Sequence, residues 1–228
     1  MSDRRSCVLA SGNQGKLVEL AGALAPHNIH LIPQSEFQVT EADESAVTFI
    51  ENALIKARHA SLATGLPALA DDSGLTVPVL GGAPGIYSAR YSLMNRGASI
   101  NDEALYKNGA PVDSEPQSDQ KPSDSDNMTR LLFELKNYSG EQRAARFVCV
   151  LAYLEHADDP EPIIATGYWS GRITESIESE GGFGYDPIFY CPQTGMTAAA
   201  MGKHRKSTVS HRGVAIRNLQ QQLLQRSS

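Results

Sequence analysis

The pair of carboxylates in Ala70-Asp71-Asp72-Ser73-Gly74 is the part of this chain with the clearest chemical potential. Adjacent carboxylates repel each other, and burying them without a partner costs on the order of several kcal/mol, so such a pair sits in solvent or beside a cation. The apolar run 66–70 predicts a short buried strand that delivers the pair to its C-terminal end, where α/β proteins bind ligands. Because Asp, Ser and Gly are also turn residues, a simple turn is the alternative.

A second candidate is the glycine-containing turn Ser11-Gly12-Asn13-Gln14-Gly15-Lys16, between a predicted strand at 8–10 and a predicted helix from about residue 16. Free backbone N–H groups and the positive end of the helix can bind phosphate, and the Lys16 ammonium adds a point charge. The turn is not a Walker A loop, because only two residues separate Gly12 from Gly15 and Leu17 follows Lys16. An ordinary strand-to-helix turn is the alternative.

Glu44 lies just ahead of a predicted long helix that reaches about residue 63 and whose start carries the capping-box pattern Thr48-Phe49-Ile50-Glu51. A carboxylate there can simply balance the helix dipole, which is worth about 0.3–1 kcal/mol. Asn52 and Lys56 are four residues apart and share a helix face that could point into a cleft, although Lys56 could equally be a solvated charge. The predicted apolar face consists of Phe49, Ile50, Ala53, Leu54, Ala57 and Ala60.

The segment Gly181-Gly182-Phe183-Gly184-Tyr185-Asp186-Pro187 interleaves glycines with two aromatic residues and one acid. Glycine lets backbone approach a ligand closely, and an aromatic ring can stack on a base, which is worth about 1–3 kcal/mol. This composition favours a ligand contact over the alternative, a bulged hairpin.

The basic segment Lys206-Ser207-Thr208-Val209-Ser210-His211-Arg212-Gly213 is the last candidate. Ser210 suits a helix N-cap, which puts His211 and Arg212 in the first turn, where a cation opposes the helix dipole. The Arg donor fork and the tunable His donor suit a phosphate or a carbonyl-bearing base. A solvated basic patch is the alternative.

The elements around these candidates predict an α/β fold. Apolar patterning predicts strands at 29–32, 75–80 and 147–154, the last central to a sheet, and a hairpin of 163–169 with 172–177. It also predicts a helix from Met128 to Leu135 and a C-terminal helix from about 210 to 224 with Val214, Ile216, Leu219 and Leu223 inward. The polar stretch at about 98–126 predicts a flexible surface insertion.

Composition limits the class of protein. With 228 residues and 41% hydrophobic side chains, the chain can bury one substantial core or form two small lobes around a cleft. A net charge of −6 argues against a nucleic-acid binder. Its three cysteines, Cys7, Cys149 and Cys191, are far apart, which fits core packing in a reduced compartment and excludes a thiolate zinc site of the usual spacing. No apolar segment approaches a signal or membrane-spanning length, so we expect a soluble, cytoplasmic protein without a membrane partner.

The candidate segments also occur together in a known family. Ser11-Gly12-Asn13-x-x-Lys16, Glu51-Asn52-Ala53-x-x-Lys56-Ala57, the segments 70–75 and 81–91, Gly182–Pro187 and Ser210–Gly213 follow in order along the chain. In this order they resemble the inosine/xanthosine triphosphate pyrophosphatases, the Ham1/RdgB-like family. Two segments depart from that pattern: the polar stretch 98–126 is longer than expected, and 202–205 is basic where relatives often carry acids.

The resemblance implies a single domain over 1–228, made of two α/β lobes with a mixed, strongly twisted central sheet, flanking helices and an active-site cleft between the lobes. It further implies a homodimer and Mg²⁺-dependent hydrolysis of the inosine, deoxyinosine and xanthosine triphosphates ITP, dITP and XTP to monophosphate and pyrophosphate, which cleanses the nucleotide pool. A house-cleaning pyrophosphatase of different base preference and a non-catalytic nucleotide-binding protein are the alternatives.

The family pattern also implies roles for individual residues. Asp72 would accept a proton and bind the metal, with Glu44 as the second metal carboxylate and Lys56 as a further catalytic residue. The triphosphate would bind to Ser73 and to the turn Ser11, Gly12, Asn13, Gln14, Gly15 and Lys16. The nucleotide and its base would contact Phe183, Gly184, Tyr185, Asp186, Lys206, His211 and Arg212. Donors from His211 and Arg212 would accept the 6-oxygen of hypoxanthine or xanthine and leave the 6-amino group of adenine unpaired.

Overall fold

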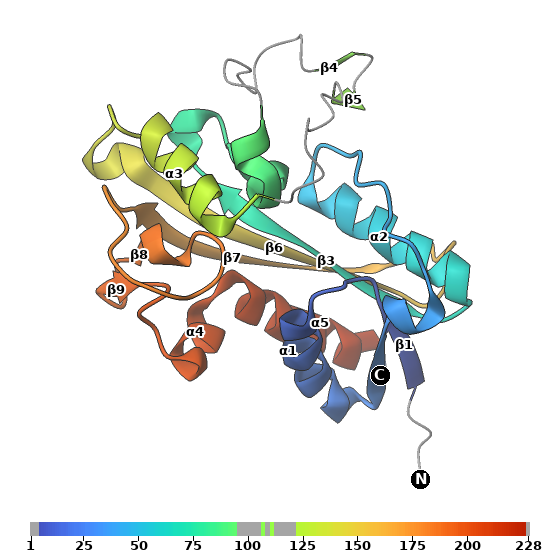
Figure 1. Ribbon diagram of the computed structural model, residues 1–228. Helices are drawn as coiled ribbons and strands as arrows, with labels where there is room; N and C mark the ends of the chain where they lie inside the picture. The colour runs from blue at the N-terminus through green and yellow to red at the C-terminus, as the bar shows by residue number, and fades with distance from the viewer. Residues whose placement is uncertain (1–4, 95–105, 108–109, 112–121, 227–228) are drawn as a thin grey trace. The chain divides into compact units, whose positions relative to one another are not determined.

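The computed structural model describes residues 5–94, 106–107, 110–111 and 122–226 (Figure 1). Most of the polar segment predicted to be a flexible insertion lies outside the described residues, so that prediction stays open. Its last residues are described and belong to a helix start: Ser123 and Asp126 form a capping box, and the helix begins at Asp124, four residues before the predicted Met128. No helix in the described ranges is long and apolar enough to cross a bilayer.

The described residues form α-helices, β-strands and short 3-10 helices. Its α-helices are α1 (Gln14–Leu24), α2 (Phe49–Thr64), α3 (Asp124–Glu134), α4 (Lys203–Val209) and α5 (His211–Arg226). Its strands are β1 (Arg5–Leu9), β2 (Ile29–Pro33), β3 (Ala68–Thr76), β4 (Tyr106–Lys107), β5 (Ala110–Pro111), β6 (Ala144–Leu154), β7 (Ile163–Ile173), β8 (Phe189–Cys191) and β9 (Met196–Thr197). Short 3-10 helices are η1 (Ala25–His27), η2 (Gln34–Phe37), η3 (Pro78–Leu80), η4 (Gly85–Leu93), η6 (Gly140–Arg143) and η7 (Asp186–Ile188).

Seven strands form one twisted sheet in the order β2-β1-β3-β6-β7-β8-β9. The β1 strand pairs in parallel with β2 and β3, whereas β8 pairs antiparallel with β7 and β9. The predicted α/β class with a mixed sheet and flanking helices is therefore confirmed, and β6 occupies the central position expected for 147–154.

Two strand predictions were wrong. We expected a strand to end at Ala70 and a new strand at 75–80, with a turn at the acidic pair as the alternative to a cation site. Instead β3 runs unbroken from Ala68 to Thr76, and 78–80 forms η3. Likewise Ser170 and Gly171, taken as a hairpin turn, lie inside the single strand β7. Polar and small residues are tolerated in both strands because tertiary contacts, rather than local propensity, stabilise them.

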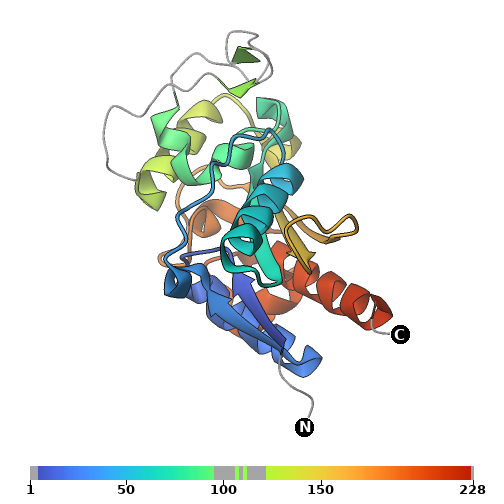
Figure 2. The same ribbon diagram turned by 90° about the vertical axis from the view of Figure 1, so that its right-hand side faces the viewer.

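The chain divides into two compact units, the first from 1–73, 149–167 and 211–228, the second from 74–148 and 168–210. In the first unit α1 and α5 lie side by side on one face of the strands, and α2 lies on the other face (Figures 1 and 2). The apolar faces of α1 and α5 pack on the strands over a core that includes Leu9, Leu20, Leu69, Leu151 and Leu219.

The inner face of α2 is narrower than predicted. Ala53, Ala57 and Ala60 are buried, but Ile50 is exposed, and the polar Asn52 is buried instead. Asn52 is tolerated there because its side-chain oxygen accepts a hydrogen bond from the backbone N–H of Ala46 at 3.1 Å. This contact attaches the segment carrying Glu44 to the helix that carries Lys56.

In the second unit α3 packs on η4 over a core centred on aromatic rings. The ring of Phe189 lies 4.5 Å from that of Phe147 and 4.9 Å from that of Trp169, in the tilted arrangement that aromatic pairs prefer. All three cysteines are free and buried, Cys7 and Cys149 in the first core and Cys191 in the second. The prediction that they serve core packing is confirmed.

Gly167 sets the approach of β7 to the start of α5 within the first unit. A Cβ atom at this position would collide with the carbonyl oxygen of His211 and lie 2.5 Å from the backbone nitrogen of Ala215. Because neither backbone atom can rotate away, we expect Gly167→Ala to lower the free energy of unfolding by about 3 kcal/mol or more, at or beyond the upper end for overpacked cores.

Denaturant unfolding followed by circular dichroism measures this effect, with Gly22→Ala as the matched control. A Cβ on Gly22 in α1 meets no atom within 4 Å, so the control should gain about 0.5–1 kcal/mol from helix propensity. Equal stabilities of the two variants would contradict the proposed collision.

Candidate active site

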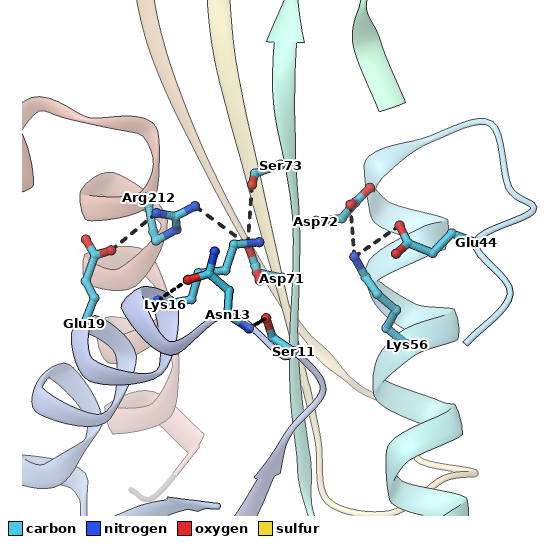
Figure 3. A network of polar contacts seen from close by, with 10 residues as sticks. All are labelled: Ser11, Asn13, Lys16, Glu19, Glu44, Lys56, Asp71, Asp72, Ser73 and Arg212. Carbon is cyan, nitrogen blue, oxygen red and sulfur yellow. Dashed lines mark hydrogen bonds and ion pairs between the residues drawn. The ribbon is translucent and has the colours of Figure 1, made fainter. Parts of the chain in front are cut away.

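Strand alternation separates the two carboxylates of the acidic pair. Successive side chains of a strand point to opposite faces, so Asp71 and Ser73 share one face of β3 and Asp72 points to the other. Figure 3 shows the result: Asp71 points toward α1 and α5, whereas Asp72 points toward α2. Both aspartates are buried, and each has its own lysine.

Asp71 is the centre of one polar cluster. Its side chain is completely buried, and its Oδ2 atom lies 2.8 Å from Nζ of Lys16 and 4.0 Å from Nη2 of Arg212. The hydroxyl of Ser73 donates to the same oxygen at 3.4 Å. Burial by itself would raise the pKa of Asp71, but Lys16 and Arg212 overcome this effect and hold the pKa below its usual value. Asp71 is therefore an ionised anchor for two cations.

Lys16 reaches this anchor from a capped helix start. The side-chain oxygen of Asn13 accepts a hydrogen bond from the backbone N–H of Lys16, and Oγ of Ser11 accepts one from the N–H of Asn13, both at 3.2 Å. The helix α1 begins at Gln14, two residues earlier than predicted, so Gln14 and Gly15 lie in its first turn. The predicted strand-turn-helix arrangement from Ser11 to Lys16 is thus present.

Glu19 is a member of this cluster that the sequence patterns did not indicate. Its Oε2 atom lies 3.4 Å from Nη1 of Arg212, whose charge is thereby shared between Glu19 and Asp71. Arg212 and His211 do lie in the first turn of α5, as predicted from Ser210. The carboxylates of Glu19 and Asp71 offset the unfavourable position of Arg212 at a helix N-terminus. Only the spacing of Lys16 and Glu19, three residues apart on one helix face, could have indicated that Glu19 belongs here.

The second cluster contains Asp72, Lys56 and Glu44. The Nζ atom of Lys56 donates to Oδ1 of Asp72 at 3.0 Å and to Oε2 of Glu44 at 3.3 Å (Figure 3). The side chains of Lys56 and Asp72 are 14% and 12% exposed, and that of Glu44 is 37% exposed. Burial lowers the pKa of Lys56, but Asp72 and Glu44 outweigh it and raise the pKa overall. Burial, followed by the nearby carboxylates, keeps the pKa of Asp72 above its usual value despite Lys56.

This cluster has the donors that a hard divalent cation prefers. Oδ2 of Asp72 is buried and has no hydrogen-bond partner in the described part of the chain, and the side chain of Glu44 is partly exposed to solvent. Mg²⁺ is usually held by one or two carboxylates and completes its shell with water and substrate phosphates. The arrangement of Asp72 and Glu44 therefore fits such an ion. Within the described residues, no group of three or more His, Cys, Asp or Glu side chains gathers around one point.

The other predicted contacts belong to the second unit. Phe183 is 65% exposed, and its backbone N–H donates to Oδ2 of Asp186 at 2.8 Å. Asp186 is buried and also accepts a hydrogen bond from Nζ of Lys206. The N–H of Gly184 donates to Asp124, a residue outside the predicted site, at 2.7 Å. This unit therefore presents an exposed aromatic ring and an ion pair in which Asp186 is buried and Lys206 is partly exposed.

Tyr185 differs from its neighbours. Its ring is buried in the second core, and its hydroxyl donates to the carbonyl oxygen of Ser88 at 2.9 Å. Burial raises its pKa. Because the side chain is committed to packing, only the backbone of Tyr185 remains for the ligand contact that we predicted.

The fold and these two clusters define the class of the protein: an α/β protein whose strand β3 carries one lysine-paired carboxylate on each face. The Ham1 family model matches residues 7–222, and the chain belongs to this family. It is 49% identical to the dITP/XTP pyrophosphatase of Escherichia coli O157:H7 over 212 residues, 93% of this chain and 94% of that protein.

Comparison with solved structures leads to the same family. The chain resembles a HAM1 protein from Coxiella burnetii with a TM-score of 0.81 and 40% identity, covering 97% of this chain and 99% of that one. It resembles the Staphylococcus aureus Ham1 protein with a TM-score of 0.77 and 36% identity, covering 98% and 100%. The family predicted from the six motifs is therefore confirmed.

Proposed function

We propose that this protein is a nucleoside-triphosphate pyrophosphatase that hydrolyses the non-standard purine nucleotides dITP, XTP and ITP to the monophosphate and pyrophosphate. Relatives 46–49% identical over more than nine-tenths of the chain are dITP/XTP pyrophosphatases. The observation that carries the proposal is the cluster of Asp72, Lys56 and Glu44, which combines a base, a cation for phosphate and a second hard ligand.

The proposed chemistry follows from these residues. Asp72, whose pKa is raised, orients a water and takes its proton as the oxygen attacks phosphorus. Lys16 and Lys56 stabilise the negative charge that grows on the phosphates, and Asp71 keeps Lys16 oriented toward them. Mg²⁺ would be held by Asp72 and Glu44 and would supply positive charge to the phosphate oxygens. The hydroxyls and backbone N–H groups from Ser11 to Gly15, together with Ser73, complete the phosphate contacts.

We propose that the base contacts side chains that donate hydrogen bonds and one exposed aromatic ring. The exposed ring of Phe183 offers a stacking surface, and Lys206, His211 and Arg212 offer donors for oxygens of the base. Hypoxanthine and xanthine carry a 6-oxygen, whereas adenine carries an amino group that would leave these donors unpaired. Selection against ATP is the expected consequence.

This account of base selection can be tested with Arg212→Ala. We expect the ratio of kcat/KM for ITP over ATP to fall by about tenfold or more, because a hydrogen-bonding site rejects an unpaired analogue strongly. The thermal midpoint should be recorded alongside, since Arg212 also pairs with Glu19 and Asp71. An unchanged ITP-to-ATP ratio in a folded variant would rule out base reading by Arg212.

Further parts of the proposal concern the protein as a whole. We propose Mg²⁺ as the physiological ion, a single catalytic domain over 1–228, a homodimer and a cytoplasmic location, with no nucleic-acid partner. The net charge of −6 supports the last point. Size-exclusion chromatography with light scattering tests the dimer directly.

Product analysis tests the activity. The protein is incubated with Mg²⁺ and each of ITP, dITP, XTP, ATP and GTP, and products are separated by ion-exchange chromatography. We expect monophosphate and pyrophosphate from the first three. Stepwise release of inorganic phosphate would refute cleavage between the α and β phosphates. Turnover of modified pyrimidine nucleotides instead would favour a house-cleaning enzyme of different base preference, and binding without turnover would favour a nucleotide-binding protein.

A further inference from the structure

Lys56 is shared between two carboxylates, whereas Lys16 serves one buried carboxylate. The Lys56 ammonium bonds Asp72 and Glu44 at once, and both are the carboxylates that suit a divalent cation. One positive charge facing two negative charges leaves this cluster with a net charge of −1. The cluster therefore still attracts cations while its existing cation holds one oxygen of each carboxylate.

Two further features indicate that this arrangement can change. Oδ2 of Asp72 is buried, and no described residue forms a hydrogen bond with it, so the carboxylate has unused capacity to bind a cation. Glu44 lies outside helices and strands, between η2 and α2, and is 37% exposed. Lys56 carries its ammonium on a flexible four-carbon stem, which lets the charge move while the helix stays in place.

We propose that Lys56 is an internal counter-ion of the cation site, which holds Asp72 and Glu44 until a divalent cation displaces it and thereby frees its ammonium for the triphosphate. The proposal rests on the proposed function for the identity of the anion, but the exchange of cations concerns only the chain and the metal. Two cations held by the same pair of carboxylates repel each other, so entry of the ion weakens both bonds of Lys56.

The exchange has a thermodynamic consequence. A metal ion that binds without triphosphate must break two ion pairs and leave a partly buried ammonium without a partner, so its affinity is reduced. A polyphosphate supplies a new partner for that ammonium. Metal and polyphosphate should therefore bind with positive coupling, each tightening the other by the same factor.

The test measures metal binding to the substrate-free protein. Mg²⁺ is titrated by calorimetry, and Mn²⁺ by the loss of its free-ion paramagnetic resonance signal, into wild type, Lys56→Met, Lys56→Arg and Lys16→Met. We expect Lys56→Met to bind both ions about tenfold more tightly than wild type, within the range of typical coupling factors. Lys56→Arg keeps the competing charge and should stay within about threefold of wild type.

Lys16→Met is the matched control. It removes the same charge from the same unit, but from the partner of Asp71 rather than from Asp72 and Glu44. If Lys16→Met and Lys56→Met tightened metal binding equally, the change in net charge alone would explain the effect, and the proposal would be overturned. Unchanged or weaker metal binding in Lys56→Met would also overturn it. If Lys56→Met does not fold, as judged by circular dichroism, Lys56→Gln is read against the same criteria.

A second readout uses inorganic tripolyphosphate as the probe. In wild type its presence should tighten Mn²⁺ binding to the protein more than it does in Lys56→Met, after correction for the Mn²⁺ that the probe binds itself. Equal tightening in both proteins would contradict the release of Lys56. Failure of the proposed function is distinguishable, because it would appear as absent hydrolysis of ITP, dITP and XTP by wild type while these metal affinities kept the expected order.

Discussion

Asp71→Asn is expected to lower the free energy of unfolding by about 3–5 kcal/mol, the cost of breaking a buried ion pair by removing one partner. The side chain of Asp71 is fully buried and holds Lys16 at 2.8 Å, with Arg212 at 4.0 Å. Asparagine keeps the shape but removes the negative charge, so of the carboxylates in this cluster only Glu19 would remain to balance the two cations. Denaturant unfolding at pH 7 measures the loss.

The pH dependence of the same variant provides a second measurement. Because the pKa of Asp71 in the folded protein is lowered, its ionisation stabilises the fold above the unfolded pKa of about 3.9. That stabilisation is lost as pH falls through the lowered folded pKa. Wild type should therefore lose stability in acid more steeply than Asp71→Asn. A loss of stability below about 1 kcal/mol at pH 7 would contradict the role of Asp71 as an ionised anchor. So would equally steep losses of stability in acid for wild type and Asp71→Asn.

Asp72→Asn is expected to impair catalysis strongly while leaving the stability of the protein nearly unchanged. As the proposed proton acceptor and metal ligand, Asp72 should matter for turnover, and we expect kcat for ITP hydrolysis to fall by about 10²–10⁴-fold. Its stability should change little. Burial and two neighbouring carboxylates disfavour the charge of Asp72, as its raised pKa indicates, so neutralising this side chain removes an unfavourable charge along with the bond to Lys56.

The two adjacent aspartates are therefore each other's controls. Asparagine is the same substitution at neighbouring positions of one strand, and only the face of the sheet differs. A folded Asp72→Asn protein with full activity would remove Asp72 from the proposed mechanism. If Asp72→Asn destabilised the protein as much as Asp71→Asn, the two aspartates would not have the separate roles proposed here, with Asp71 stabilising the fold and Asp72 serving catalysis.

Much of the fold could be predicted from local patterns. The helix start at Thr48 was readable because capping side chains act within three residues along the chain, whereas the cap at Asn13 was missed and α1 was placed two residues too late. Strand β6 was readable because a long run of buried apolar residues suits a central strand. The acidic segment of β3 was misread, since Asp and Gly in a strand contradict local propensity and only neighbouring strands and lysines make them acceptable there.

The ordered motifs were enough to identify the family, and it was the resemblance to that family that made Lys16, Glu44, Lys56, Asp72 and Arg212 the candidate site residues. Their pairing could not be read from the chain and became visible only in the folded protein. Asp71 became the anchor of Lys16 and Arg212, Glu19 joined them from α1, and Lys56 was found between Asp72 and Glu44. The physical reason is that these ion pairs join side chains up to 193 residues apart, whose charges meet only after strand alternation and helix packing have set their directions.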